Sequence, residues 1–171
     1  MTNRLQQLDQ GFRAAVPFIW CLFWSLLEQI PLDLPGLPFV MPNLLLASVF
    51  FWSVNRPDLL PFLALFILGT VHDLWVGGPF GLTPLALILM RLFVISQQRI
   101  LAQRLFVISW WGFVIVAILF GALTWTLSSL QSDRLLDPTV LAFQAFLTIA
   151  IYPMVARLMA QFQRRMLDRS L

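Results

Sequence analysis

Long apolar runs, separated by short polar or glycine- and proline-rich connections, fill most of the chain. A helix that spans a membrane needs about 20 apolar residues, with a range of roughly 17–25. We expect six such helices, and their ranges are about 14–32, 39–54, 59–75, 82–96, 105–127 and 139–159. The second run is short for a span, so it must recruit flanking residues, lie in thinned bilayer or pack within a hairpin. A basic tail is expected at 160–171.

The composition places this chain in the lipid bilayer. Hydrophobic residues make up 60% of the 171 residues and charged residues 11%, whereas soluble domains have roughly 45–50% and about 25%. A soluble domain of this size exposes too much surface to bury so much apolar material. We therefore predict an all-α fold, a polytopic six-transmembrane-helix bundle that forms a single integral membrane domain over residues 1–171. Connections this short leave no room for a soluble domain, so any chemistry would lie between the helices.

The arginines predict how the bundle is oriented. The chain has eleven Lys and Arg residues, all of them Arg. With both termini in the cytoplasm, Arg134 alone falls in an outer loop, which is the bias of the positive-inside rule. The positive charges are scattered over connections and ends, whereas a nucleic-acid site would cluster them on one face. We expect cytoplasmic N and C termini, an even number of spans and no nucleic-acid partner.

The densest group of polar and glycine residues lies between residues 56 and 84. His72 and Asp73 precede a glycine-rich corner that contains Gly77 and Gly81. Neighbouring residues on a helix do not face each other, so His72 and Asp73 form no dyad by themselves. Asp73 either ends its helix by hydrogen bonding to the corner or to a neighbouring helix, or it faces a partner or ligand. With one His and no ligand spacing, the sequence offers no metal site, and it shows no cofactor motif.

Two further charges are predicted inside the spans. Arg91 lies near the middle of the fourth run, where a charge costs about 2.5–3.5 kcal/mol on insertion scales. Its side chain either snorkels toward the cytoplasmic face or pairs with Glu28. Asn43 and Gln144 are expected to form hydrogen bonds between helices.

At the polar cluster, the chain resembles the MreD family of bacterial rod-shape-determining proteins. The matching pattern is Gly69-x-x-x-Asp73-Leu74-x-x-Gly77-x-x-x-Gly81, preceded by Arg56-Pro57. The resemblance implies a non-enzymatic, multi-pass protein of the bacterial inner membrane, in the complex that elongates rod-shaped cells. It implies MreC as the partner and, indirectly, MreB and the elongation glycan polymerase and transpeptidase of peptidoglycan synthesis. Self-association stays open.

Two other functions remain as alternatives. The MreD family is similar in architecture to the substrate-capture subunits of vitamin transporters, which implies a small vitamin-like ligand beside Asp73. An intramembrane enzyme would need two convergent titratable groups, and His72, Asp73, Glu28 and Arg91 are the residues available. The partner-binding or structural candidates are Asp73, Gly77, Gly81, His72, Arg91 and Glu28.

Overall fold

The computed structural model describes residues 16–30, 41–77, 80–98, 106–131 and 138–166, and the regular secondary structure within them is entirely helical. The first helix is Val16–Leu27. The further elements are α2 (Leu44–Asn55), the short 3-10 helix η1 (Pro57–Leu59), α3 (Phe62–Val76), α4 (Leu82–Ser96), α6 (Phe106–Gln131) and α7 (Pro138–Met166). The expected all-α class is confirmed for this part of the chain.

The helices fall into two length classes. Stretches of α6 (Phe106–Leu130) and α7 (Pro138–Gln163) are long and apolar enough to cross a membrane, whereas the other apolar helices have 10–17 residues. The range of α4 coincides with the fourth predicted run. Which of the helices cross a membrane remains a prediction.

Several boundaries differ from the prediction: α3 begins at Phe62 rather than at residue 59, and α6 ends at Gln131 rather than at residue 127. The first helix ends at Leu27, and residues 28–30 form turns and a bend. Helix α2 begins at Leu44, where the side chain of Asn43 caps it by accepting a hydrogen bond from the N–H of Leu46 at 2.7 Å. The intervening residues 31–40 lie outside the described part of the chain.

A further difference concerns the start of the predicted basic tail. Helix α7 continues to Met166, so the segment expected to be a basic tail from residue 160 begins as helix. The ring of Phe162 stacks on Trp20 of the first helix with 4.0 Å between centroids. This contact gives the last turns of α7 a packing partner.

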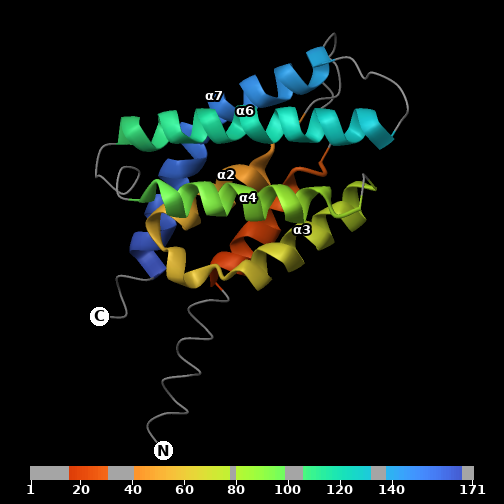
Figure 1. Ribbon diagram of the computed structural model, residues 1–171. Helices are drawn as coiled ribbons and strands as arrows, with labels where there is room; N and C mark the ends of the chain where they lie inside the picture. Colours follow the sequence, from red (N-terminus) through yellow and green to blue (C-terminus); the bar gives the residue numbers. More distant parts are fainter. Residues whose placement is uncertain (1–15, 31–40, 78–79, 99–105, 132–137, 167–171) are drawn as a thin grey trace, which may run out of the picture.

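Helix α2 forms the centre of the bundle (Figure 1). Its residues from Leu45 to Val54 are all buried, which is typical of a helix that is hydrophobic all round. It packs against α4, α6 and α7, and Phe50 contacts the rings of Phe113 and Tyr152 at 5.3 and 5.9 Å. A helix covered on all sides does not need to match the bilayer thickness, which explains how α2 can be so short.

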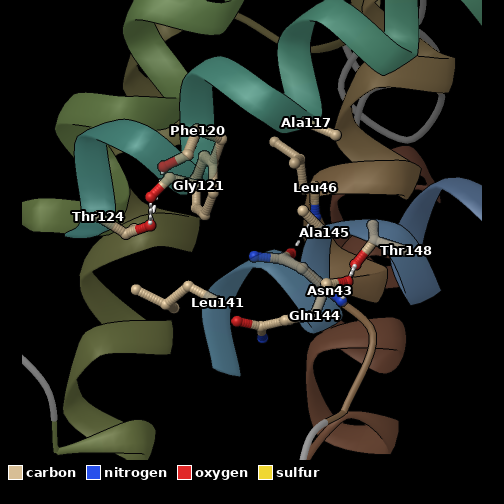
Figure 2. Close-up of a pocket in the computed structure, with 10 residues that line it drawn as sticks. All are labelled: Asn43, Leu46, Ala117, Phe120, Gly121, Thr124, Leu141, Gln144, Ala145 and Thr148. Carbon is tan, nitrogen blue, oxygen red and sulfur yellow. Dashed lines mark hydrogen bonds between the residues drawn. The ribbon is translucent and has the colours of Figure 1, made fainter. Parts of the chain in front are cut away.

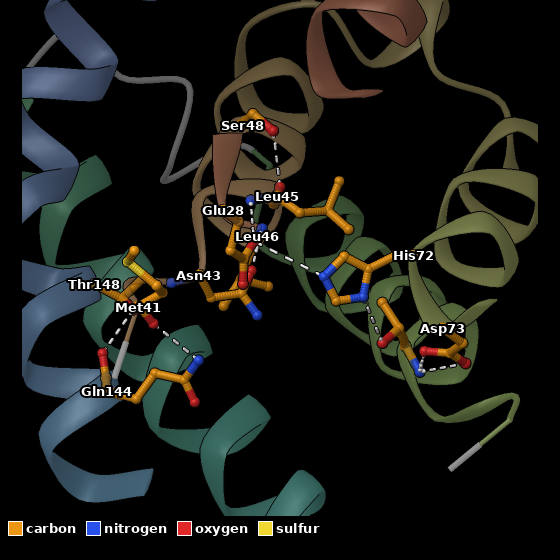
Figure 3. A network of polar contacts seen from close by, with 11 residues as sticks. Glu28, Met41, Asn43, Leu45, Leu46, Ser48, His72, Asp73, Gln144 and Thr148 are labelled. Atoms are coloured by element: carbon orange, nitrogen blue, oxygen red, sulfur yellow. Dashed lines mark hydrogen bonds and ion pairs between the residues drawn. The ribbon is translucent and has the colours of Figure 1, made fainter. Parts of the chain in front are cut away.

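Helix α3 lies at the edge and packs mainly on α4, with which it forms an antiparallel hairpin (Figure 1). The start of α2, the end of α3 and the start of α4 come together at one end of the bundle, where Glu28, Asn43, His72 and Asp73 are also found (Figure 3).

Candidate functional site

Asp73 belongs to the last turns of α3, yet its carboxylate caps the first turn of α4. Its Oδ2 accepts a hydrogen bond from the N–H of Gly81 at 2.7 Å, and its two oxygens lie 3.3 and 3.4 Å from the backbone nitrogen of Thr83. The first turn of a helix has N–H groups without partners and a partial positive charge, both of which favour a carboxylate. Gly81 is the N-cap residue and has no side chain for this purpose. The hydrogen bond expected from Asp73 to the glycine-rich corner is therefore present.

The glycines of the pattern serve two different purposes. Gly77 ends α3 with φ 68°, its N–H bonded to the carbonyl oxygen of Asp73 at 3.0 Å, and Gly81 has φ 90°. These are left-handed conformations that glycine adopts at low cost. Gly69 instead permits close contact, because a Cβ atom there would lie 2.4 Å from the backbone N and Cα of Pro84. The close approach of α3 and α4 thus depends on Gly69 rather than on the corner.

His72 connects α3 to the turn that follows the first helix. Its Nδ1 lies 3.4 Å from Oγ1 of Thr83, and its Nε2 lies 3.8 Å from Oε2 of Glu28. The same Glu28 oxygen accepts a hydrogen bond from the N–H of Leu45 at 3.4 Å. His72 and Asp73 therefore have different partners, as expected for neighbouring residues of a helix.

A second set of hydrogen bonds joins α2 to α7 (Figure 3). The N–H of Asn43 donates to Oγ1 of Thr148 at 2.9 Å, and this hydroxyl donates to the carbonyl oxygen of Gln144 at 2.7 Å. The Nε2 of Gln144 donates to the carbonyl oxygen of Met41 at 3.0 Å. The expected hydrogen bonds between helices are met only in part: the side chain of Gln144 reaches the segment before α2, whereas the side chain of Asn43 caps its own helix and only its backbone N–H bonds to α7.

A small cavity adjoins this set of hydrogen bonds (Figure 2). Its volume is about 20 Å³, and its polar lining comes from Asn43, Thr124, Gln144 and Thr148. One water molecule requires roughly 10–15 Å³ and two or more polar partners. The cavity can hold a single water, which would add a further bridge between α2, α6 and α7.

A comparison of the sequence with models of known protein families identifies the family of this chain. The family model described as rod shape-determining protein MreD matches residues 10–162, nearly the whole chain. The chain belongs to the MreD family. Membership gives it a role in rod shape determination and associates it with the membrane, as the sequence pattern indicated. Searches of curated proteins and of solved structures found no match.

The MreD pattern of this chain coincides with the α3–α4 hairpin. Gly69 permits the close contact, Asp73 caps α4, and Gly77 and Gly81 shape the corner. The pattern thus encodes one structural unit: two short helices held together at a backbone contact and at a shared helix end.

Arg91 lies elsewhere, near the other end of α4. Its guanidinium donates to the carbonyl oxygen of Pro57 and contacts Oγ of Ser53 at 3.5 Å, and it lies 5.6 Å from the ring centre of Phe62. The pairing of Arg91 with Glu28 is therefore wrong, because Glu28 contacts His72 and the start of α2. The buried guanidinium instead fastens α4 to the connection between α2 and α3, on the side predicted to be cytoplasmic.

The six candidate residues therefore fall into two groups. Glu28, His72, Asp73, Gly77 and Gly81 gather at one end of the bundle, whereas Arg91 stands apart. Sequence reasoning did not single out Thr83 and Thr148, which link helices through their backbone N–H or hydroxyl groups. A threonine in the second position of α4 is compatible with a capped helix start, but this signal is too common to identify it.

Proposed function

We propose that this MreD protein is a non-enzymatic, six-span subunit of the bacterial inner membrane that docks MreC in the rod-shape complex. Through MreC it would position MreB and the peptidoglycan-synthesising enzymes. The family match over residues 10–162 carries this proposal. The apolar helices, two of which are long enough to cross a membrane, support the membrane location.

The bonding of the charged residues favours docking over chemistry. Asp73 and Glu28 accept hydrogen bonds from backbone N–H groups, and Arg91 donates to a backbone carbonyl. Groups engaged in this way hold helix ends in place. Under the vitamin-capture alternative, the carboxylate of Asp73 would contact the ligand. That carboxylate already accepts hydrogen bonds from the backbone N–H groups of Gly81 and Thr83, which disfavours this alternative.

The side chains around the corner supply a surface for the partner. Leu74, Trp75 and Phe80 are 65%, 43% and 73% exposed. They surround the turn on the side predicted to face the periplasm, where MreC-family proteins have their main mass. Large aromatic side chains often anchor protein interfaces. We propose that these three side chains, which we call the corner surface, contact MreC, while the buried Asp73, Gly77 and Gly81 hold the corner in shape.

Copurification with MreC in mild detergent tests this proposal. Trp75→Ala and Phe80→Ala should each reduce the recovered MreC by about tenfold, the effect of a modest hot-spot residue, with unchanged thermal unfolding. Leu63→Ala is the matched control, since Leu63 is 69% exposed at the opposite end of α3, and it should leave recovery unchanged. Wild-type recovery with both corner variants would show that MreC docks elsewhere or not at all.

The cellular role has its own test. Depletion of the protein in a rod-shaped host should round the cells, because side-wall synthesis loses its membrane subunit. Cells that continue to elongate as rods would contradict the proposal.

A further inference from the structure

The two sides of the bundle present apolar helices of different lengths. Helices α3 and α4 have 15 residues each, which is about 22 Å at the helical rise, and α6 has 26 residues, about 39 Å. The hydrocarbon core of a bilayer is about 30 Å thick. Helices α4 and α6 contact each other, so the short and the long helices meet side by side (Figure 1). A long helix can fit a thinner bilayer by tilting, but α4 and α6 run nearly parallel in Figure 1, so a common tilt would shorten both spans. A bilayer of constant thickness then fits one of them better than the other.

The outward face of α3 has the character of a lipid-facing surface. It exposes Leu63, Phe66 and Ile67, all large apolar side chains. Helix contacts within membranes favour small residues, which allow backbones to approach. Of the small residues of α3, Gly69 faces inward against Pro84, Ala64 packs against the core, and the hydroxyl of the partly exposed Thr70 donates to the carbonyl oxygen of Phe66 in the same helix. The outward face thus fits flexible acyl chains better than a packed helix.

Contacts to α4 fix both ends of the segment that carries this apolar face of α3. At one end the exposed Arg56 and Asp58 lie at η1, which precedes α3, and Arg91 holds this connection through the carbonyl oxygen of Pro57. At the other end the chain turns at Gly77 and Gly81, where Asp73 binds the start of α4. Because both ends are bonded to α4, α3 cannot lengthen its apolar face by sliding or by adding helical turns.

From these lengths and ends we infer that the bilayer is thinner beside α3 and α4 than beside α6, and that lipids with short acyl chains collect on the α3–α4 side. The inference rests on the proposed membrane embedding and goes beyond it, since docking of MreC requires no difference in thickness. Bilayer mismatch costs fractions of a kcal/mol per Å, enough to enrich a better-fitting lipid.

Two matched labelling sites test the inference. Ile67 on α3 and Ile115 on α6 are 43% and 47% exposed, and each is replaced by Cys in a Cys21→Ala background that lacks the only native thiol. The full chain, labelled with bimane, is reconstituted in equal mixtures of myristoleoyl and eicosenoyl phosphatidylcholine. A nitroxide on the acyl chain of either lipid then reports which one touches the label. Leu89→Cys on α4, 43% exposed, is a second site on the short side.

We expect the ratio of short-chain to long-chain quenching to be about twofold higher at Ile67→Cys and Leu89→Cys than at Ile115→Cys. Equal ratios at all three sites would overturn the inference. Quenching at Ile115→Cys with none at Ile67→Cys would also overturn it, since protein rather than lipid would then cover α3. Absence of quenching at all three sites would contradict the membrane embedding itself, and so separates failure of the proposed function from failure of this inference alone.

Discussion

Gly69 of α3 lies so close to Pro84 of α4 that a Cβ atom on Gly69 would be 2.4 Å from the backbone N and Cα of Pro84. Since backbone atoms cannot move aside as a flexible side chain can, this contact leaves no room for a side chain at position 69. This contact and the Asp73 cap, on either side of the start of α4, define the hairpin that carries the MreD pattern.

The two kinds of glycine should respond differently to substitution. Gly69→Ala forces α3 and α4 apart and should cost about 3 kcal/mol, at the upper end for overpacking. Gly77→Ala meets open space and should cost about 1 kcal/mol for its left-handed backbone. Unfolding of the purified protein in detergent measures both. If Gly77→Ala proves the more damaging, the close contact is not what stabilises the hairpin.

The cap formed by Asp73 predicts a graded response. Asp73→Ala leaves the N–H groups of Gly81 and Thr83 without their acceptor and should cost about 2 kcal/mol. Asp73→Asn keeps one acceptor oxygen, so it should lower the free energy of unfolding by less than Asp73→Ala does. Gln97→Ala, which removes an exposed polar side chain, is the control and should change stability by less than about 0.5 kcal/mol. Equal losses for Asn and Ala at position 73 would show that the negative charge, not the cap, is what matters.

Arg91 should control the order of the connection between α2 and α3. Arg91→Leu removes the donor to the carbonyl oxygen of Pro57, so the N–H of Leu59, bonded to the Arg56 oxygen at 3.2 Å, should exchange with deuterium faster. Ser53→Ala removes only the 3.5 Å contact and should leave this exchange nearly unchanged. Unaltered exchange in Arg91→Leu would mean that the connection is held by other contacts.

Double-mutant cycles can separate the two pairings considered for Glu28. Glu28→Gln and His72→Gln should be coupled by about 0.5 kcal/mol or more, because their side chains are in contact. The effects of Glu28→Gln and Arg91→Gln on the free energy of unfolding should be additive within about 0.3 kcal/mol, since the two residues have separate partners. The reverse result would restore the Arg91–Glu28 pair.

The helices themselves follow from the sequence because apolar runs and their breakers are local signals. Helix α4 begins at Leu82 and ends at Ser96, as the apolar run does, and the glycine-rich corner ends α3 where expected. Helix α7 runs past the predicted end because Phe162 finds a ring partner on another helix. A contact of that kind leaves no trace in the local pattern.

The pairing of polar residues could be predicted only in part. Asp73 and Gly81 are eight residues apart across a tight turn, so geometry alone brings them together. Glu28 and His72, or Asn43 and Thr148, come from parts of the chain that are far apart in sequence. Helices that are apolar on all faces carry little information about which face meets which neighbour, and for this reason the sequence leaves both Glu28 and the cytoplasmic face open as surroundings of Arg91.

The central claim is that the whole chain crosses the membrane an even number of times and leaves both ends in the cytoplasm. Reporter fusions at the two termini, within residues 78–79 and within residues 132–137 test it most directly. We expect cytoplasmic signals at both termini and periplasmic signals at both internal sites. Termini on opposite faces of the membrane would contradict it.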